Sequence, residues 1–123
     1  MLEKRALQLA VLLACAVPIS AGSYGMATGF NITGIDMSSH MRYLSGLLLG
    51  IGFGFISAIP DIEYKSTRFR LLTGIVVMGG LGRLIGVWMD GMPGPAMQFA
   101  LVMELIITPS LYLWQRKLSR RAA

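Results

Sequence analysis

Residues 71–91 read LLTGIVVMGGLGRLIGVWMDG, an apolar and glycine-rich segment with a single arginine in its interior. About 20 such residues, wound as a helix, span the roughly 30 Å hydrocarbon core of a bilayer. In that core, Arg83 would cost about 3 kcal/mol or more unless an opposite charge lay beside it. The segment therefore predicts a transmembrane helix, and it raises the question of which residue is the partner of Arg83.

The composition of the whole chain points to lipid as its solvent. Hydrophobic residues make up 54% of the 123 residues and charged residues only 14%, whereas average globular chains carry about 25% charged residues. The chain also contains 15 glycines, a residue that is more frequent in transmembrane helices than in soluble ones. We therefore expect an integral membrane protein.

Proline and glycine divide the chain into four apolar segments. Pro60 ends the second segment, Gly91 ends the third, and Pro95 suits the first turn of the fourth. Because a backbone in lipid must satisfy its own hydrogen bonds, each segment should be a helix. The predicted fold is all-α, an integral membrane four-helix bundle that forms one domain over residues 1–123. Its spans are expected at about 6–28, 39–59, 68–90 and 95–115.

The first connection should be the least regular part of the chain. We expect residues 23–41 to form the longest irregular segment and to lie against the outer membrane surface, because they are too apolar to be a free tether. Ser38 or Ser39 is the expected amino-terminal cap of the second helix.

The positive charges predict an orientation. Of the 11 Lys and Arg residues, nine lie in the amino-terminal segment, the connection after Pro60 and the carboxyl-terminal tail. Because cytoplasmic loops carry the excess of Lys and Arg, both termini are expected in the cytoplasm. The two remaining cations are Arg42 and Arg83.

The amino-terminal segment has a second interpretation. A basic start followed by an apolar run also resembles a signal peptide, with PISAGS as a cleavage site or LLAC, ending at Cys15, as a lipoprotein processing box. We expect an uncleaved transmembrane helix, in which Cys15 is a small packing residue.

Depth along the helices suggests a partner for Arg83. The third helix runs outward, so Arg83 should lie about 10 Å below its outer end. The fourth helix runs back inward, and Glu104 should lie about 12 Å below the same face. Since their short connection makes these helices antiparallel neighbours, we expect an ion pair between Arg83 and Glu104.

Two more charged residues are expected near this pair. Arg42 lies about one turn inside the second helix, and Asp90 follows Arg83 on the same face of the third. The candidate layer, either a ligand-binding site or a structural ion-pair layer, therefore consists of Arg42, Arg83, Glu104 and Asp90. A structural clamp and a ligand site both stay open at this point.

Glycines follow Arg42 at helical spacing and lie on both sides of Arg83. Small residues let neighbouring helices approach closely, which predicts helix packing at Gly46, Gly50, Gly54, Gly79, Gly82 and Gly86. In the last helix, Pro109 cannot donate to the carbonyl of Leu105, so it should loosen the helix one turn from Glu104.

The residue types argue against several function classes. The chain has one Cys and one His, and it lacks a Ser/His/Asp set, a phosphate-binding loop and a metal-ligand cluster. We therefore expect no enzymatic activity, no cofactor and no metal. Nucleic acid is not an expected partner either, because the basic residues sit at the ends of apolar runs rather than along one surface.

The motifs MRYLSGLLLGIG (residues 41–52) and GRLIGVWMDGMP (residues 82–93), with the glutamate inside the last helix, resemble a family of small four-helix bacterial membrane proteins of unknown function. The resemblance extends from about Met41 to Leu113, and the layout is loosely similar to the DoxX-like group. It implies a multi-pass protein of the bacterial inner (cytoplasmic) membrane. It also implies that the family's characteristic positions are Arg42, Arg83, Gly86, Asp90, Gly91 and Glu104.

Two functions follow as hypotheses. The first is an accessory or interaction subunit of a membrane complex, whose partners are membrane lipids and other membrane subunits or further copies of the chain. The alternative is a binder or carrier of a lipid, a quinone or a small anionic ligand at the layer of Arg42, Arg83 and Glu104.

Overall fold

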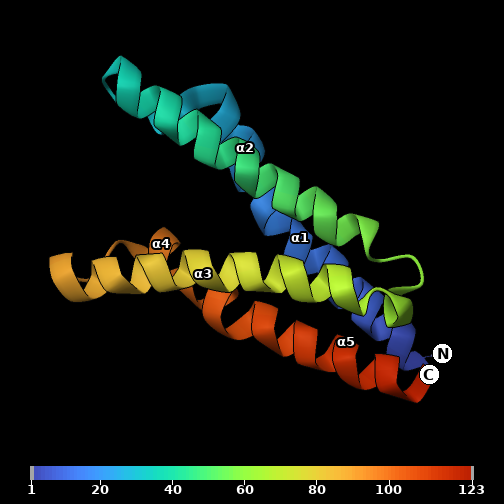
Figure 1. The fold of residues 1–123 in the computed structure, drawn as a ribbon. Helices are drawn as coiled ribbons and strands as arrows, with labels where there is room; N and C mark the ends of the chain where they lie inside the picture. Colours follow the sequence, from blue (N-terminus) through green and yellow to red (C-terminus); the bar gives the residue numbers. More distant parts are fainter. Residues whose placement is uncertain (1, 123) are drawn as a thin grey trace. The chain divides into compact units, whose positions relative to one another are not determined.

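The computed structural model describes residues 2–122 and is all-α, with about 90% of the chain in helices. Three helices run without interruption: α1 (Leu2–Thr28), α2 (Ile35–Ser57) and α3 (Ser66–Asp90). The last helix consists of α4 (Pro95–Val102), a π-helical turn η3 (Met103–Ile107) and α5 (Thr108–Ala122) (Figure 1). Short 3-10 turns, η1 (Gly29–Asn31) and η2 (Ile62–Tyr64), lie in two of the connections.

Tertiary contacts divide the chain into two compact units. Residues 8–60 form the α1–α2 unit, and the segment up to Leu7 together with the residues from Asp61 onward forms the α3–α5 unit. The single domain expected over residues 1–123 stays a prediction.

Three helical stretches within the described residues are long and apolar enough to cross a membrane: Leu2–Asn31, Ser66–Asp90 and Pro95–Ala122. The all-α class is confirmed, while membrane insertion and the inward position of both termini stay predictions. The expected span at 39–59 overlaps α2, which ends at Ser57 and is not among the three stretches. The amino-terminal half of α2 carries Asp36, His40 and Arg42, and these polar residues lower its hydropathy.

The α1–α2 unit is a helical hairpin with a tight contact at glycines. A Cβ atom on Gly22 would lie 2.8 Å from the backbone nitrogen of Leu49, and one on Gly52 would lie 2.7 Å from Cγ1 of Ile19. Because real Cβ atoms do not approach other atoms this closely, only glycine lets the two backbones meet here. Val11 and Cys15 on α1, with Phe55 on α2, are buried in this unit.

The connection between α1 and α2 is much shorter than the irregular segment expected over residues 23–41. Helix α1 continues to Thr28, whose side chain accepts a hydrogen bond of 3.1 Å from the backbone N–H of Phe30. Phe30 and Gly34 adopt positive φ values, 56° and 95°, which reverse the chain within a few residues. Helix α2 consequently starts at Ile35 after Gly34, so the cap expected at Ser38 or Ser39 is wrong.

The α3–α5 unit is built around a buried cluster at its polar end. Leu7, Ile62 and Phe69 are fully buried, and the ring of Phe69 stacks on that of Tyr112 at 6.4 Å between centroids. Gln115 is also fully buried, and its Nε2 donates to the carbonyl of Ile62 at 2.8 Å. This side chain therefore joins η2 to α5.

The start of α1 closes the same end of this unit. Lys4 Nζ lies 3.0 Å from Oε1 of Glu63. Glu3 forms an ion pair with Arg121 and accepts a hydrogen bond of 3.3 Å from Nε1 of Trp114. Figure 1 shows the first turn of α1 beside the end of α5. These contacts hold the charged ends of the unit together.

Candidate functional site

The structure brings Arg83 and Glu104 together. Arg83 lies on α3 and Glu104 in the π-helical turn η3, and Nε of Arg83 is 2.8 Å from Oε1 of Glu104. The side chain of Glu104 is 17% exposed and that of Arg83 is 38% exposed. The glutamate is therefore largely enclosed, whereas part of the Arg83 side chain is exposed.

The hydrogen bonding of this pair is incomplete. Oε1 of Glu104 is buried, and no residue between 2 and 122 other than Arg83 offers it a donor. The guanidinium also donates from Nη1 to Sδ of Met97, on α4, at 2.9 Å. A thioether is a weak acceptor, and the pair accordingly retains unused hydrogen-bonding capacity.

The π-helical turn that carries Glu104 is placed by the proline after it. The backbone N–H of Thr108 bonds to the carbonyl of Met103, five residues earlier, and the Thr108 hydroxyl donates to the same carbonyl at 2.7 Å. Pro109 has no N–H and its ring crowds the carbonyl of Leu105, so a regular α-helical turn is disfavoured at this point. The loosening expected here takes the form of a π turn, a feature that often lies at functional sites.

Helix α3 approaches η3 most closely at Gly80. A Cβ atom there would lie 2.8 Å from Cδ2 of Leu105 and 3.0 Å from Cβ of Glu104. At Gly79 the nearest atom, Oε2 of Glu104, would be 3.7 Å away. Gly79 was among the predicted packing glycines and Gly80 was not, although two adjacent glycines indicate a close helix contact at either position.

The other predicted packing glycines differ in their surroundings. A Cβ atom on Gly82, Gly86 or Gly50 would meet no described atom within 4 Å, and one on Gly46 would be 3.7 Å from Sδ of Met26. Gly54 accepts a hydrogen bond of 2.6 Å from the hydroxyl of Ser57. Packing among the described residues therefore does not explain the glycines at positions 50, 82 and 86.

Arg42 makes its contacts within the α1–α2 unit. Its Nη1 donates to the carbonyls of Met26 and Ala27 at 2.6 and 3.1 Å. The last carbonyls of a helix have no intrahelical partner and carry partial negative charge, and α1 has no basic residue in its own last turn. Arg42 thus caps α1, which is a structural role that the sequence reasoning did not foresee.

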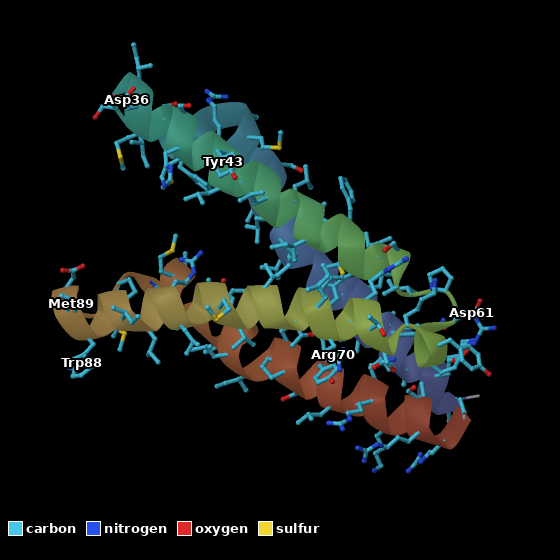
Figure 2. The ribbon with its side chains drawn as sticks, in the orientation of Figure 1. Asp36, Tyr43, Asp61, Arg70, Trp88 and Met89 are labelled. Carbon is cyan, nitrogen blue, oxygen red and sulfur yellow. The ribbon has the colours of Figure 1, made fainter. Side chains whose placement is uncertain are left out.

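Asp90 lies apart from the pair. It is the last residue of α3, is exposed, and its side chain makes no hydrogen bond or ion pair with residues 2–122. Two turns of helix separate it from Arg83, about 10 Å along the axis. Trp88 and Met89 beside it are exposed as well (Figure 2). The candidate site is therefore the Arg83–Glu104 pair with its neighbours Gly79, Gly80 and Met97.

The Arg42 cap leads to a prediction for the end of α1. Arg42→Ala should increase hydrogen exchange in the last turn of α1, with a local loss of about 1 kcal/mol, because two carbonyls lose a charged donor. Exchange read by mass spectrometry over residues 22–28 measures the effect, and residues 8–15 serve as the internal reference. His40→Ala, an exposed change on the same helix, is the matched control. Equal exchange in the two variants would show that Arg42 does not act as a cap.

No group of three or more His, Cys, Asp or Glu residues that could hold a metal ion is found among the described residues.

Comparison with known proteins assigns the chain to a family without assigning it an activity. The model of a family described as a domain of unknown function, DUF4345, matches residues 6–115. No curated protein and no solved structure gives a significant match. The match agrees with the resemblance to an uncharacterised family, while the looser likeness to the DoxX-like group stays a prediction. Because the family model covers most of its length, the chain belongs to the DUF4345 family of domains of unknown function.

Proposed function

We propose that this chain is a non-enzymatic, multi-pass protein of the bacterial inner membrane that packs as an accessory subunit against another membrane protein. Three helical stretches with the length and hydropathy of membrane spans support the first part. Apart from Arg83, the cations of the α3–α5 unit gather at the end that holds Lys65 and the tail, which supports an orientation with both termini in the cytoplasm.

The main support for the subunit proposal is the surface around Arg83, where a charged side chain is exposed beside two glycines. The side chain of Arg83 is 38% exposed within the apolar stretch of α3, and a charge exposed to lipid is costly. On the same helix, Gly82 and Gly86 leave space that no described atom occupies. A helix of a partner protein, packed on this surface, would enclose the charge and fill the space.

The orientation is tested by labelling two opposite ends of the α3–α5 unit. In a Cys15→Ser background, Gly94→Cys should react with a membrane-impermeant maleimide added to intact cells, because the α3–α4 connection lies outside. Lys65→Cys should react only after the cells are permeabilised. Labelling of Lys65→Cys but not Gly94→Cys in intact cells would reverse the orientation, and labelling of both would argue against membrane insertion.

The subunit proposal is tested by the mass of the particle extracted from native membranes in mild detergent. The protein portion should exceed the 13.4 kDa of one chain. Gly86→Leu should reduce this mass, because the added side chain fills the space offered to a partner helix. Gly74→Leu, at another α3 glycine with no described atom within 4 Å, is the matched control and should leave the mass unchanged. A monomer of the unaltered chain would contradict the proposal.

A second candidate, a small-ligand binder, is favoured by one observation. Oε1 of Glu104 is buried, and Arg83 is its one charged neighbour among the described residues, with no second donor to this atom; such an acceptor suits a ligand that offers an O–H group, such as a lipid headgroup or a quinol. Native mass spectrometry of the extracted protein should then show a bound small molecule that Glu104→Gln releases. The same spectrum for both forms would count against this candidate.

A further inference from the structure

A basic groove lies at the opposite end of the α3–α5 unit from the connection between α3 and α4. It has a cavity volume of about 400 Å³ between the start of α3 and the second half of α5. Three arginines line it, Arg70 from α3 and Arg116 and Arg120 from α5. Figure 2 shows Arg70 on the side of α3 that faces α5. Two helices therefore direct guanidinium groups to one cavity.

The arginines of this groove have no counter-ion among the described residues. The three carboxylates at this end are already engaged: Glu3 by Arg121, and Glu63 and Asp61 by Lys4, at 3.0 and 3.9 Å. The side chains of Arg70, Arg116 and Arg120 make no hydrogen bond or ion pair with residues 2–122, and no described carboxylate lines the groove. The charge of the groove is thus left for an anion from outside the chain.

The remaining lining groups are hydroxyls, and their hydrogen bonds run toward the groove. Nε2 of the buried Gln115 donates to Oγ of Ser66 at 3.2 Å, and Ser66 donates to Oγ of Ser119 at 2.9 Å. The orientation of the Gln115 amide is set by its other hydrogen bond, since the carbonyl of Ile62 can only accept. The hydroxyl hydrogen of Ser119 is left at the end of this series, so Ser119 offers a donor to the groove.

The helix ends add to this charge and partly offset one another. Helix α3 starts at Ser66 without a side-chain cap, so its first N–H groups place about half a positive charge beside the groove. The end of α5 contributes about half a negative charge of its own. The three guanidinium charges therefore dominate the field in the groove.

We propose that this groove binds a phosphate group. Guanidinium groups match phosphate oxygens with paired hydrogen bonds, and a cavity of about 400 Å³ exceeds the space of a single small ion, since a water molecule takes about 30 Å³. The phosphodiester of an anionic phospholipid and free phosphate share this chemistry. The position at the polar ends of two apolar helices favours the headgroup, because basic pockets there recognise anionic lipids. The inference does not depend on a partner subunit.

The test compares two double variants that each remove two positive charges. Arg70→Gln/Arg116→Gln alters the groove, whereas Arg5→Gln/Lys117→Gln alters exposed cations of the same unit that do not line it. Native mass spectrometry measures the binding of phosphatidylglycerol relative to phosphatidylcholine, and a separate titration uses inorganic phosphate. The groove variant should lose at least about tenfold in affinity for phosphatidylglycerol and the control less than about threefold.

Each outcome of this comparison decides the proposal. A preference for phosphatidylglycerol that only the groove variant loses supports a lipid headgroup, and the same pattern with inorganic phosphate alone supports free phosphate. Equal losses in both double variants, or binding of neither ligand, would overturn the proposal. Ser119→Ala, which removes one donor and no charge, should weaken binding about threefold and serves as the readout where a double variant fails to fold.

Discussion

Glu104→Ala should lower the free energy of unfolding of the α3–α5 unit by about 3 kcal/mol. The substitution leaves the guanidinium of Arg83 without the carboxylate that lies 2.8 Å from it. Met97 is the only other described acceptor of Arg83. Its thioether sulfur is too weak an acceptor to compensate for the lost carboxylate charge. An arginine retained on an apolar helix without its counter-ion is the costly state.

Intrinsic fluorescence measures this effect during thermal unfolding in mild detergent, since both tryptophans of the chain, Trp88 and Trp114, belong to the α3–α5 unit. Asp90→Ala is the matched control, because it removes an exposed carboxylate from α3 and should change stability by less than about 0.5 kcal/mol. The same melting temperature for both variants would show that Glu104 does not stabilise Arg83.

Gly80→Val should destabilise the same unit by about 3 kcal/mol or more, because it overfills the contact between α3 and η3. The Cβ atom alone would lie 2.8 Å from Cδ2 of Leu105 and 3.0 Å from Cβ of Glu104. The two γ-methyl groups of valine need further space, so α3 must move away from η3. This movement would also lengthen the contact between Arg83 and Glu104.

The matched control for Gly80→Val is Gly74→Val on the same helix. No described atom lies within 4 Å of a Cβ at Gly74, and valine is a better helix former than glycine. Gly74→Val should therefore be neutral or slightly stabilising in the same fluorescence experiment. A loss of stability as large as that of Gly80→Val would mean that the close approach at Gly80 is not what limits the side chain.

The helices could be predicted from hydropathy and from the positions of proline and glycine, because both signals act locally. The predicted ends at residues 28 and 90 and the predicted start at residue 95 coincide with the ends of α1 and α3 and the start of α4. The contact between Arg83 and Glu104 followed from the constant rise of a helix and a short connection, which place residues at known depths. Neither inference requires knowledge of how a helix is rotated about its own axis.

The details that escaped prediction depend on that rotation and on the path of the connections. Which of the neighbouring glycines faces η3 depends on how α3 is rotated about its axis, and the sequence does not show this rotation. Arg42 reaches the end of α1 because the connection reverses within a few residues at Gly34. The basic groove could not be predicted because Arg70 and Arg116 are 46 positions apart in the sequence. From the sequence alone, these residues indicate only the orientation of the chain in the membrane.

The central claim is that Arg83 and Glu104 stabilise the protein as a pair. A double-mutant cycle of Arg83→Ala, Glu104→Ala and the double variant measures this most directly, from unfolding followed by tryptophan fluorescence. We expect a coupling free energy of about 2 kcal/mol, with the double variant more stable than Glu104→Ala alone, because it no longer holds an unpaired charge. Two single effects that add to within about 0.5 kcal/mol would contradict the account.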